Sequence, residues 1–177
     1  AHGIGGGMTQ ELIAGVFVEA FDDPTLRLLE DSAVLRMEAS RLAFTTDSFV
    51  VSPLFFKGGD IGKLAVCGTV NDLAVMGATP RYLSVSFILE EGLEIATLKR
   101  VVGSMATTAK EADVRIVAGD TKVVERGSGD GVFITTTGIG AVSAGLEISA
   151  ANAKTGDKVI LNPFLLPGDS LDERPNR

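Results

Sequence analysis

Residues 58–77, GGDIGKLAVCGTVNDLAVMG, are the stretch that decides the fold prediction. A Gly-Gly turn precedes Asp60, whose carboxylate can accept N–H bonds at a helix start, and Gly77 supplies a left-handed stop. Between these signals, apolar residues recur at three- and four-residue steps. The stretch therefore predicts a helix over residues 60–76, in which Gly68 leaves room for close approach of another backbone.

Asn71 and Asp72 lie late on this predicted helix. A buried carboxylate without a partner is unfavourable by several kcal/mol or titrates to its neutral form. The pair therefore indicates a metal ion or a cluster of donors nearby, or else a solvated position at the end of a helix. The residues alone leave both interpretations open.

Composition indicates a globular protein of the cytosol, with no membrane or nucleic-acid partner. The net charge of −7 disfavours non-specific nucleic-acid binding, because no basic stripe is available to displace counterions. No apolar run reaches the roughly 18 residues that a membrane helix needs. The single cysteine, Cys67, excludes an internal disulfide and fits a reducing compartment. An anionic ligand would then need a metal ion or backbone amides.

Glycine is concentrated at the start of the chain, at Gly3, Gly5, Gly6 and Gly7. The free N–H groups of such a loop, followed by a helix over residues 10–21, can surround a phosphate. The spacing matches neither the P-loop nor the dinucleotide fingerprint. A flexible terminus is the alternative interpretation.

Several further segments have strand or helix periodicity. Strands are predicted over 33–38 and 41–46 as a hairpin, and over 81–89, 114–118, 123–124 and 132–137, with a helix over 94–112. Most strands alternate and are not uniformly apolar, which favours a sheet covered on one face. We therefore predict an α/β (α+β) domain with one mixed or antiparallel sheet. The helices near 9–21, 60–76 and 94–112 should cover one face, and the other, apolar face should pair across a homodimer axis.

Asp47 and Asp120 each follow an apolar strand block, and Asp72 lies near a helix end. Hard oxygen ligands that converge on one cleft are what Mg²⁺ held against phosphates requires. Lys122, beside Asp120, can meet a phosphate or act as a base, or can be a solvated lysine. The loop over residues 126–131 is predicted to be a hairpin connection first and a ligand loop second.

Four separated blocks carry a resemblance to a known family. They read TDSFVVSPLFF at 46–56, GGDIG at 58–62, GTVNDLA at 68–74 and GDTKVV at 119–124. From residue 2 to about residue 160 the chain resembles the amino-terminal domain of the HypE hydrogenase maturation factors. These belong to the superfamily of aminoimidazole ribonucleotide synthetase, selenophosphate synthetase and thiamine-monophosphate kinase. The resemblance implies an enzyme that uses ATP to dehydrate a carboxamide on its own terminal cysteine to a thiocyanate, the source of hydrogenase cyanide ligands.

The same resemblance implies roles for individual residues and partners. It implies Mg²⁺ ligands at Asp47, Asp72 and Asp120, and a lysine near the reacting group at Lys122; nucleotide contacts would come from Asn71, Thr121, Gly3, Gly5, Gly6 and Gly7. It also implies a homodimer joined by a β-barrel, which works with the carbamoyltransferase and scaffold proteins of hydrogenase maturation. Ile4 and Gly7 stand where the family usually has serine and arginine, so a hydroxyl and a cation expected near phosphate are missing.

We expect the ATP-binding and dimerisation domain to cover residues 1–161. Residues 162–177 lose the family pattern and are expected to be a non-native or disordered tail, with the family's second domain and terminal cysteine absent. One hypothesis is therefore the amino-terminal half of an ATP- and Mg²⁺-binding maturation enzyme. The other is a non-catalytic dimerisation module for maturation partners. Selenophosphate synthesis is a weaker alternative, because the glycine-rich loop has no cysteine.

Overall fold

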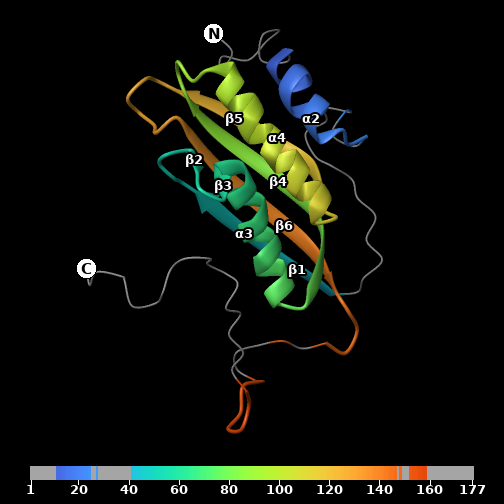
Figure 1. Ribbon diagram of the computed structural model, residues 1–177. Helices are drawn as coiled ribbons and strands as arrows, with labels where there is room; N and C mark the ends of the chain where they lie inside the picture. The colour runs from blue at the N-terminus through green and yellow to red at the C-terminus, as the bar shows by residue number, and fades with distance from the viewer. Residues whose placement is uncertain (1–10, 25–26, 28–40, 147, 149–151, 159–177) are drawn as a thin grey trace, which may run out of the picture.

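The computed structural model describes residues 11–24, 27, 41–146, 148 and 152–158 (Figure 1). The glycine-rich loop, the strand predicted over 33–38 and the tail over 162–177 lie outside the described residues. The described part is a four-stranded sheet with helices on one face and a small two-stranded sheet beside it. This is the mixed α and β architecture that the sequence predicts.

The main sheet has the order β1-β6-β4-β5. Its strands are β1 (Arg41–Phe49), β4 (Ala78–Glu90), β5 (Arg115–Val124) and β6 (Val132–Val142). The central strands β6 and β4 are antiparallel to each other, β1 pairs antiparallel with β6, and β5 pairs parallel with β4. The sheet is therefore mixed, with β1 and β5 as its two different edges.

Helix α3 (Ile61–Val75) begins directly after the small sheet of β2 (Phe55–Phe56) and β3 (Gly59–Asp60). The Asp60 carboxylate accepts the backbone N–H groups of Gly62 and Lys63 at 2.7 and 3.1 Å. Such a cap stabilises a helix by about 1 kcal/mol. Beyond the helix Gly77 has φ +70°, a conformation that favours glycine. Both ends of the predicted helix are confirmed.

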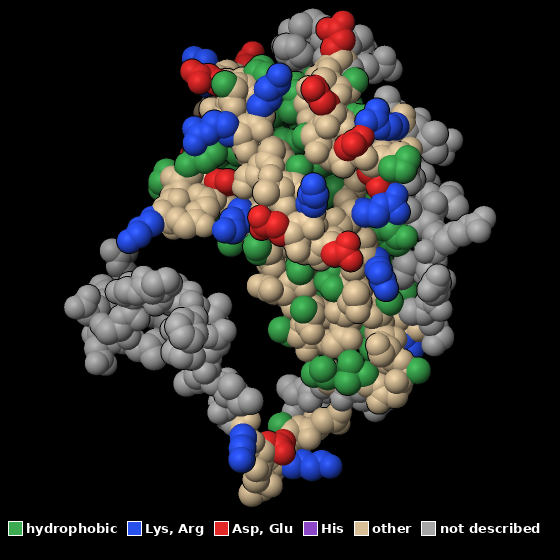
Figure 2. Space-filling view, turned by 45° about the vertical axis from the view of Figure 1, so that its right-hand side comes forward, with side chains coloured by type: hydrophobic (Ala, Val, Ile, Leu, Met, Phe, Trp, Pro, Cys, Tyr) green, Lys and Arg blue, Asp and Glu red, His purple; other side chains and the backbone are tan. Residues whose placement is uncertain are grey.

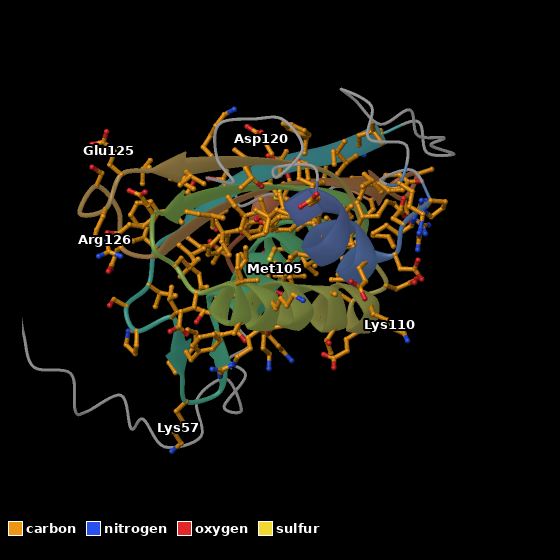
Figure 3. All side chains as sticks on the ribbon, turned by 90° about the horizontal axis from the view of Figure 1, so that it is seen from above. Lys57, Met105, Lys110, Asp120, Glu125 and Arg126 are labelled. Carbon is orange, nitrogen blue, oxygen red and sulfur yellow. The ribbon has the colours of Figure 1, made fainter. Side chains whose placement is uncertain are left out.

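The other two predicted helices are also present. Helix α4 (Ile95–Glu111) follows β4 and packs beside α3. Near the start of the described chain, the π-helical turns η1 (Ile13–Val18) run into α2 (Glu19–Phe21). All of these helices lie on the same side of the main sheet, as Figure 3 shows from above. None of the described helices is long and apolar enough to cross a membrane.

The core lies between the helices and the sheet. The alternating residues of β4 that were predicted to be buried are buried, namely Leu83, Val85, Phe87 and Leu89. They pack in one cluster with α3 and α4 residues such as Ile61, Val66, Val101 and Met105. Met105 of α4, labelled in Figure 3, is fully buried between the two layers.

The opposite face of the sheet is covered by none of the described helices, and it is apolar only in part. Leu42 and Phe44 of β1 are 54% and 70% exposed on it. Further along the strands this face carries hydroxyl groups. The Ser48 hydroxyl of β1, for example, lies 2.9 Å from the Thr135 hydroxyl of β6. The sequence predicts an apolar face, whereas the structure shows an apolar end next to a hydroxyl-rich middle.

Two predictions about the second half of the chain are wrong. Strand β5 does not end at residue 118 but continues through Val124, so Asp120 lies within the strand. The reason is that β4 is long enough to pair with β5 as far as Glu90 and Val124. The loop over 126–131 is not a hairpin connection, because β4 lies between β5 and β6 in the sheet.

Hydrogen bonds hold strand β5 at its start and in the loop that follows its end. At its start, Arg115 Nε donates to the buried Asp23 carboxylate at 2.6 Å, which ties β5 to the end of α2. Beyond its end, the Glu90 carboxylate accepts the N–H groups of Gly127 and Gly131 at 2.6 and 3.0 Å. The β5 edge is therefore held in place by the fold and does not depend on its own exposed side chains.

Candidate functional site

The candidate site is the seam between β1 and α3, where α3 passes very close to the strand. A Cβ atom on Gly68 of α3 would lie 2.8 Å from the Phe49 ring and 3.5 Å from Asp47 Oδ2. Only a residue without a side chain fits there. The prediction that another backbone approaches Gly68 is wrong, because the close neighbours are the Phe49 ring and the Asp47 carboxylate.

Asp72 lies one helical turn beyond Gly68, on the same side of α3. Its Oδ2 accepts a hydrogen bond of 3.2 Å from the Thr45 hydroxyl of β1. Asn71 and Asp72 are both exposed, so the pair is not buried as one of the two interpretations supposed. The donor beside Asp72 is Thr45, which is not among the predicted ligand or nucleotide residues. Its signal is the strand alternation, which places Thr45 and Asp47 on one face of β1.

Asp47 is half-buried, and its Oδ1 accepts the N–H of Ser48 at 2.8 Å. Across the ladder its partner is Thr136 of β6, which is fully buried. The Thr136 hydroxyl bonds the Thr69 hydroxyl of α3 and the Ala65 carbonyl. These buried hydroxyls fix α3 against β6 beneath the seam, so the seam rests on a rigid base.

The structure places Asp120 and Lys122 at the other edge of the sheet, on β5. The register runs from Ser48 of β1 through Thr135 and Ser86 to Asp120, so two strands separate the edges. Asp120 also points away from the helices, as Figure 3 shows. Within one chain Asp47 and Asp72 both lie along the β1–α3 seam, whereas Asp120 lies at the opposite edge of the sheet.

The side chains of Asp120 and Lys122 are both exposed to solvent. Lys122 Nζ lies 3.9 Å from Asp120 Oδ2, and their side chains are 72% and 63% exposed. A surface pair of this kind contributes little to stability. Thr121, between them, is half-buried and pairs with Phe87 on the helix side of the sheet. Asn71 is exposed beside Asp72, while the predicted glycine contacts lie outside the described residues.

The two carboxylates of the seam suit a metal ion that also has water and phosphate ligands. Among the described residues no group of three or more His, Cys, Asp or Glu side chains could hold a metal ion. A Mg²⁺ ion, however, is commonly bound by one or two carboxylates together with water and substrate phosphates. Asp47 and Asp72 fit that mode, whereas they do not fit an ion held entirely by protein ligands.

The charge of the visible surface is mixed. On the face shown in Figure 2, acidic and basic side chains of the described residues are interspersed and form no stripe of a single sign. This face therefore offers no counterion-releasing surface for a nucleic acid.

Comparison with known proteins defines the class of protein. Residues 29–142 match the family described as AIR synthase related protein, N-terminal domain. The match covers more than half of the chain. The chain therefore belongs to this family.

Within the family, the chain is similar to HypE. It is 57% identical over 162 residues to the carbamoyl dehydratase HypE of Cupriavidus necator, covering 91% of this chain and 46% of that protein. A solved structure of HypE in complex with ATP superposes with a TM-score of 0.79 at 55% identity, covering 80% of this chain and 42% of the other. A HypE–HypF complex gives a TM-score of 0.64 at 57% identity, covering 81% and 46%. The resemblance seen in the sequence blocks is confirmed.

The matches also show how much of each relative the chain covers. The chain spans about half the length of the curated relatives that it matches. Their name, carbamoyl dehydratase, is that of an enzyme family, and it describes proteins about twice as long.

Proposed function

We propose that this chain is the ATP-binding portion of a HypE-type carbamoyl dehydratase, which serves the maturation of nickel–iron hydrogenases. The observation that carries the proposal is the β1–α3 seam. Along it, Asp47 lies next to Gly68 and Asp72 lies next to Thr45, in a chain 55% identical to a HypE whose solved structure holds ATP. Further support comes from the relatives at 57% identity that are named carbamoyl dehydratase.

The seam residues are proposed to hold Mg²⁺ against the ATP phosphates. Asp47 and Asp72 are the metal ligands of one chain, and the exposed Asn71 amide lies beside them to contact the nucleotide. The metal, when bound, neutralises phosphate charge during phosphoryl transfer. The backbone N–H groups of Gly3, Gly5, Gly6 and Gly7 would complete the phosphate contacts, as such loops do elsewhere.

Asp120, Thr121 and Lys122 are proposed to join this site from a second copy of the chain. One chain keeps the β1 and β5 edges apart. A barrel closed by two sheets brings different edges together, because a two-fold axis can set β1 of one copy beside β5 of the other. The partly apolar open face, with Phe44 70% exposed, is the surface such a homodimer would cover. We expect that interface to exceed the ~1,600 Å² of a standard one.

The proposed reaction converts a sulfur-bound carboxamide into a thiocyanate. The carboxamide oxygen attacks the terminal phosphoryl group of ATP, releasing ADP. Phosphorylation of the oxygen leaves an O-phosphoimidate and releases one N–H proton to solvent. The phosphorylated oxygen then leaves as phosphate while the C≡N bond forms and the nitrogen loses its one remaining proton. Lys122 is proposed to accept the proton lost in that second step. The sum is carboxamide and ATP to nitrile, ADP and phosphate, so the oxygen removed ends in phosphate.

The carboxamide carrier is proposed to lie in the part of the relatives that this chain does not span. Cys67, the only cysteine, lies within α3 and is therefore not proposed as the carrier. We propose residues 1–161 as the domain proper and residues 162–177 as a tail. Dehydration then requires that further part as well, and residues 1–177 by themselves are proposed to bind nucleotide weakly and to be inactive.

The proposed partners and location follow from the same likeness. One solved relative is a HypE–HypF complex, which supports a carbamoyltransferase as the partner that loads the carboxamide. A scaffold protein of hydrogenase maturation would receive the cyanide. The cytosol is the proposed location, as the single cysteine suggests.

The second candidate is a non-catalytic dimerisation module. The separation of Asp120 from Asp47 and Asp72 favours it, because one chain alone holds an incomplete site. The two candidates differ in Mg²⁺-dependent nucleotide binding. Selenophosphate synthesis has no observation in its favour.

Calorimetric titration of ATP, with and without Mg²⁺, separates the two candidates. The proposal predicts binding that requires Mg²⁺ and that Asp72→Asn abolishes. Asp130→Asn, the same chemical change at an exposed loop residue, should bind like the parent chain. If Asp72→Asn bound Mg²⁺-ATP as well as the parent chain does, Asp72 would not be a metal ligand. If the parent chain bound no ATP at all, the non-catalytic dimerisation module would be favoured.

A further inference from the structure

We propose that Thr45 is a positioning residue that sets which oxygen of Asp72 is presented to the metal. This inference rests on the proposed Mg²⁺-ATP function of the seam. It concerns a residue outside the predicted site, and it assigns Thr45 a role in metal preference as well as in affinity.

The geometry of Thr45 is suited to this role. Its hydroxyl lies 3.2 Å from Asp72 Oδ2, and it must be the donor because an ionised carboxylate only accepts. Thr45 is half-buried in β1 and pairs with Gly138 of β6. The hydroxyl is therefore carried by a strand inside a ladder, whereas the exposed Asp72 would otherwise rotate freely on the helix surface.

Asp47 is held in the same way by a different donor. The backbone N–H of Ser48 engages Asp47 Oδ1 at 2.8 Å. Within the described part of the chain, no hydrogen bond reaches the second oxygen of Asp47 or of Asp72. Each carboxylate thus has one oxygen fixed by the protein and one oxygen available to a cation.

This arrangement favours binding through a single oxygen from each carboxylate. Mg²⁺ demands near-octahedral geometry and keeps several waters, so single-oxygen carboxylates suit it. Ca²⁺ accepts flexible geometry and two-oxygen carboxylates. A donor that occupies Oδ2 of Asp72 opposes the two-oxygen mode. Thr45 therefore favours Mg²⁺ over Ca²⁺ at the seam.

The test compares nucleotide binding supported by each metal in Thr45→Val and Thr45→Ser. Removing a hydrogen-bond partner of a metal ligand typically weakens metal binding by 10- to 100-fold. We expect Thr45→Val to weaken ATP binding with Mg²⁺ by about 10-fold, the low end for an exposed site. Binding with Ca²⁺ should change less, so the Mg²⁺ to Ca²⁺ preference falls. Thr45→Ser keeps the hydroxyl and should restore both values.

The chain offers a matched control on the same strand. The Thr46 hydroxyl donates to the Thr136 carbonyl at 3.1 Å and lies 2.9 Å from the Thr137 hydroxyl, on the face away from Asp72. Thr46→Val makes the same chemical change with no effect on Asp72. It should leave the binding of both metal–ATP complexes unchanged.

Each remaining outcome has one meaning. If Asp72→Asn abolishes binding and Thr45→Val binds Mg²⁺-ATP like the parent chain, the inference is wrong and the proposed function stands. If Asp72→Asn binds like the parent chain, the proposed function itself fails. Equal losses in Thr45→Ser and Thr45→Val, or in Thr46→Val, would show a packing effect and overturn the inference. Should Thr45→Val not fold, Thr45→Ala makes the same comparison.

Discussion

The two edges of the sheet carry similar carboxylates in very different surroundings. At the β1 edge, Asp47 of β1 and Asp72 of α3 lie along the same seam, each with one oxygen hydrogen-bonded by the protein. At the β5 edge, Asp120 and Lys122 are exposed, and Lys122 Nζ lies 3.9 Å from Asp120 Oδ2. At the β1 edge the carboxylates are therefore held by hydrogen bonds, whereas at the β5 edge the charged side chains are positioned only by their strand. This difference is the reason for the proposal that the β5 residues act only when a second copy of the chain covers them.

The largest effect expected at the β1 edge is that of Gly68→Ala. The new methyl group would meet the buried Phe49 ring at 2.8 Å, and overpacking of this kind costs roughly 1–3 kcal/mol. We expect about 2–3 kcal/mol lower free energy of unfolding in urea, with loss of Mg²⁺-ATP binding because Asp47 moves. Gly103→Ala in α4 is the matched control. Nothing lies within 4 Å of its added Cβ, so it should stabilise by up to about 1 kcal/mol. If the two variants changed the free energy of unfolding equally, the explanation by close contact at Gly68 would be wrong.

The next effect concerns the attachment of β5. Asp23 is buried and accepts from Arg115, so Asp23→Asn removes a charged partner from a buried position. We expect a loss of about 1–2 kcal/mol in the free energy of unfolding, as for a broken hydrogen bond to a charged group. Asp22→Asn is the adjacent control, because Asp22 and its partner Arg27 are both exposed. A larger loss in Asp22→Asn than in Asp23→Asn would contradict this picture of the β5 edge.

A smaller, pH-dependent effect is expected at Glu90. The N–H groups of Gly127 and Gly131, together with the nearby Arg126 charge, hold the pKa of the Glu90 carboxyl below its ordinary value. A lowered folded-state pKa means that the stabilisation is present above the unfolded pKa and is lost as pH falls through the folded pKa. Thermal melts should show Glu90→Gln less stable than the parent near neutral pH and equal to it in acid. Its exposed neighbour supplies the control, since Glu91→Gln should follow the parent at every pH.

The smallest effect on stability is expected at Asp120 itself. Its pair with Lys122 is exposed, and such pairs contribute about 0–1 kcal/mol. Asp120→Asn should leave the free energy of unfolding within about 0.5 kcal/mol of the parent value. Mg²⁺-ATP binding should nevertheless be lost, because the proposed site needs this carboxylate. A variant that loses stability without losing binding would make Asp120 a structural residue.

The parts of the fold with local signals could be predicted from the sequence. Asp60 and Gly77 determine the ends of α3 through their own side chain and backbone preference, and both ends are confirmed. The buried face of β4 follows from strict alternation. These features depend on near neighbours along the chain, so sequence patterns contain them.

The parts that depend on pairing between distant segments could not be predicted. The polar run at 119–122 reads as the end of a strand, yet β4 pairs with β5 through Val124 and keeps it extended. Likewise, β6 follows β5 in sequence but pairs with β4 and β1. The candidate site shows the same limit. Patterns place Asp47, Asp72 and Asp120 near ends of elements, but only strand order shows that they occupy two different edges.

Mixing two defective chains tests most directly the claim that both edges build one site. Asp72→Asn and Asp120→Asn, each unable to bind Mg²⁺-ATP, are unfolded together and refolded as a mixture. If the site joins β1 of one copy to β5 of the other, half of the dimers are mixed and each keeps one complete site. The mixture should then recover about a quarter of the parental binding capacity by calorimetry. No recovery, with mixed dimers confirmed by native mass spectrometry, would contradict the two-copy site, and so would a chain that sediments as a monomer.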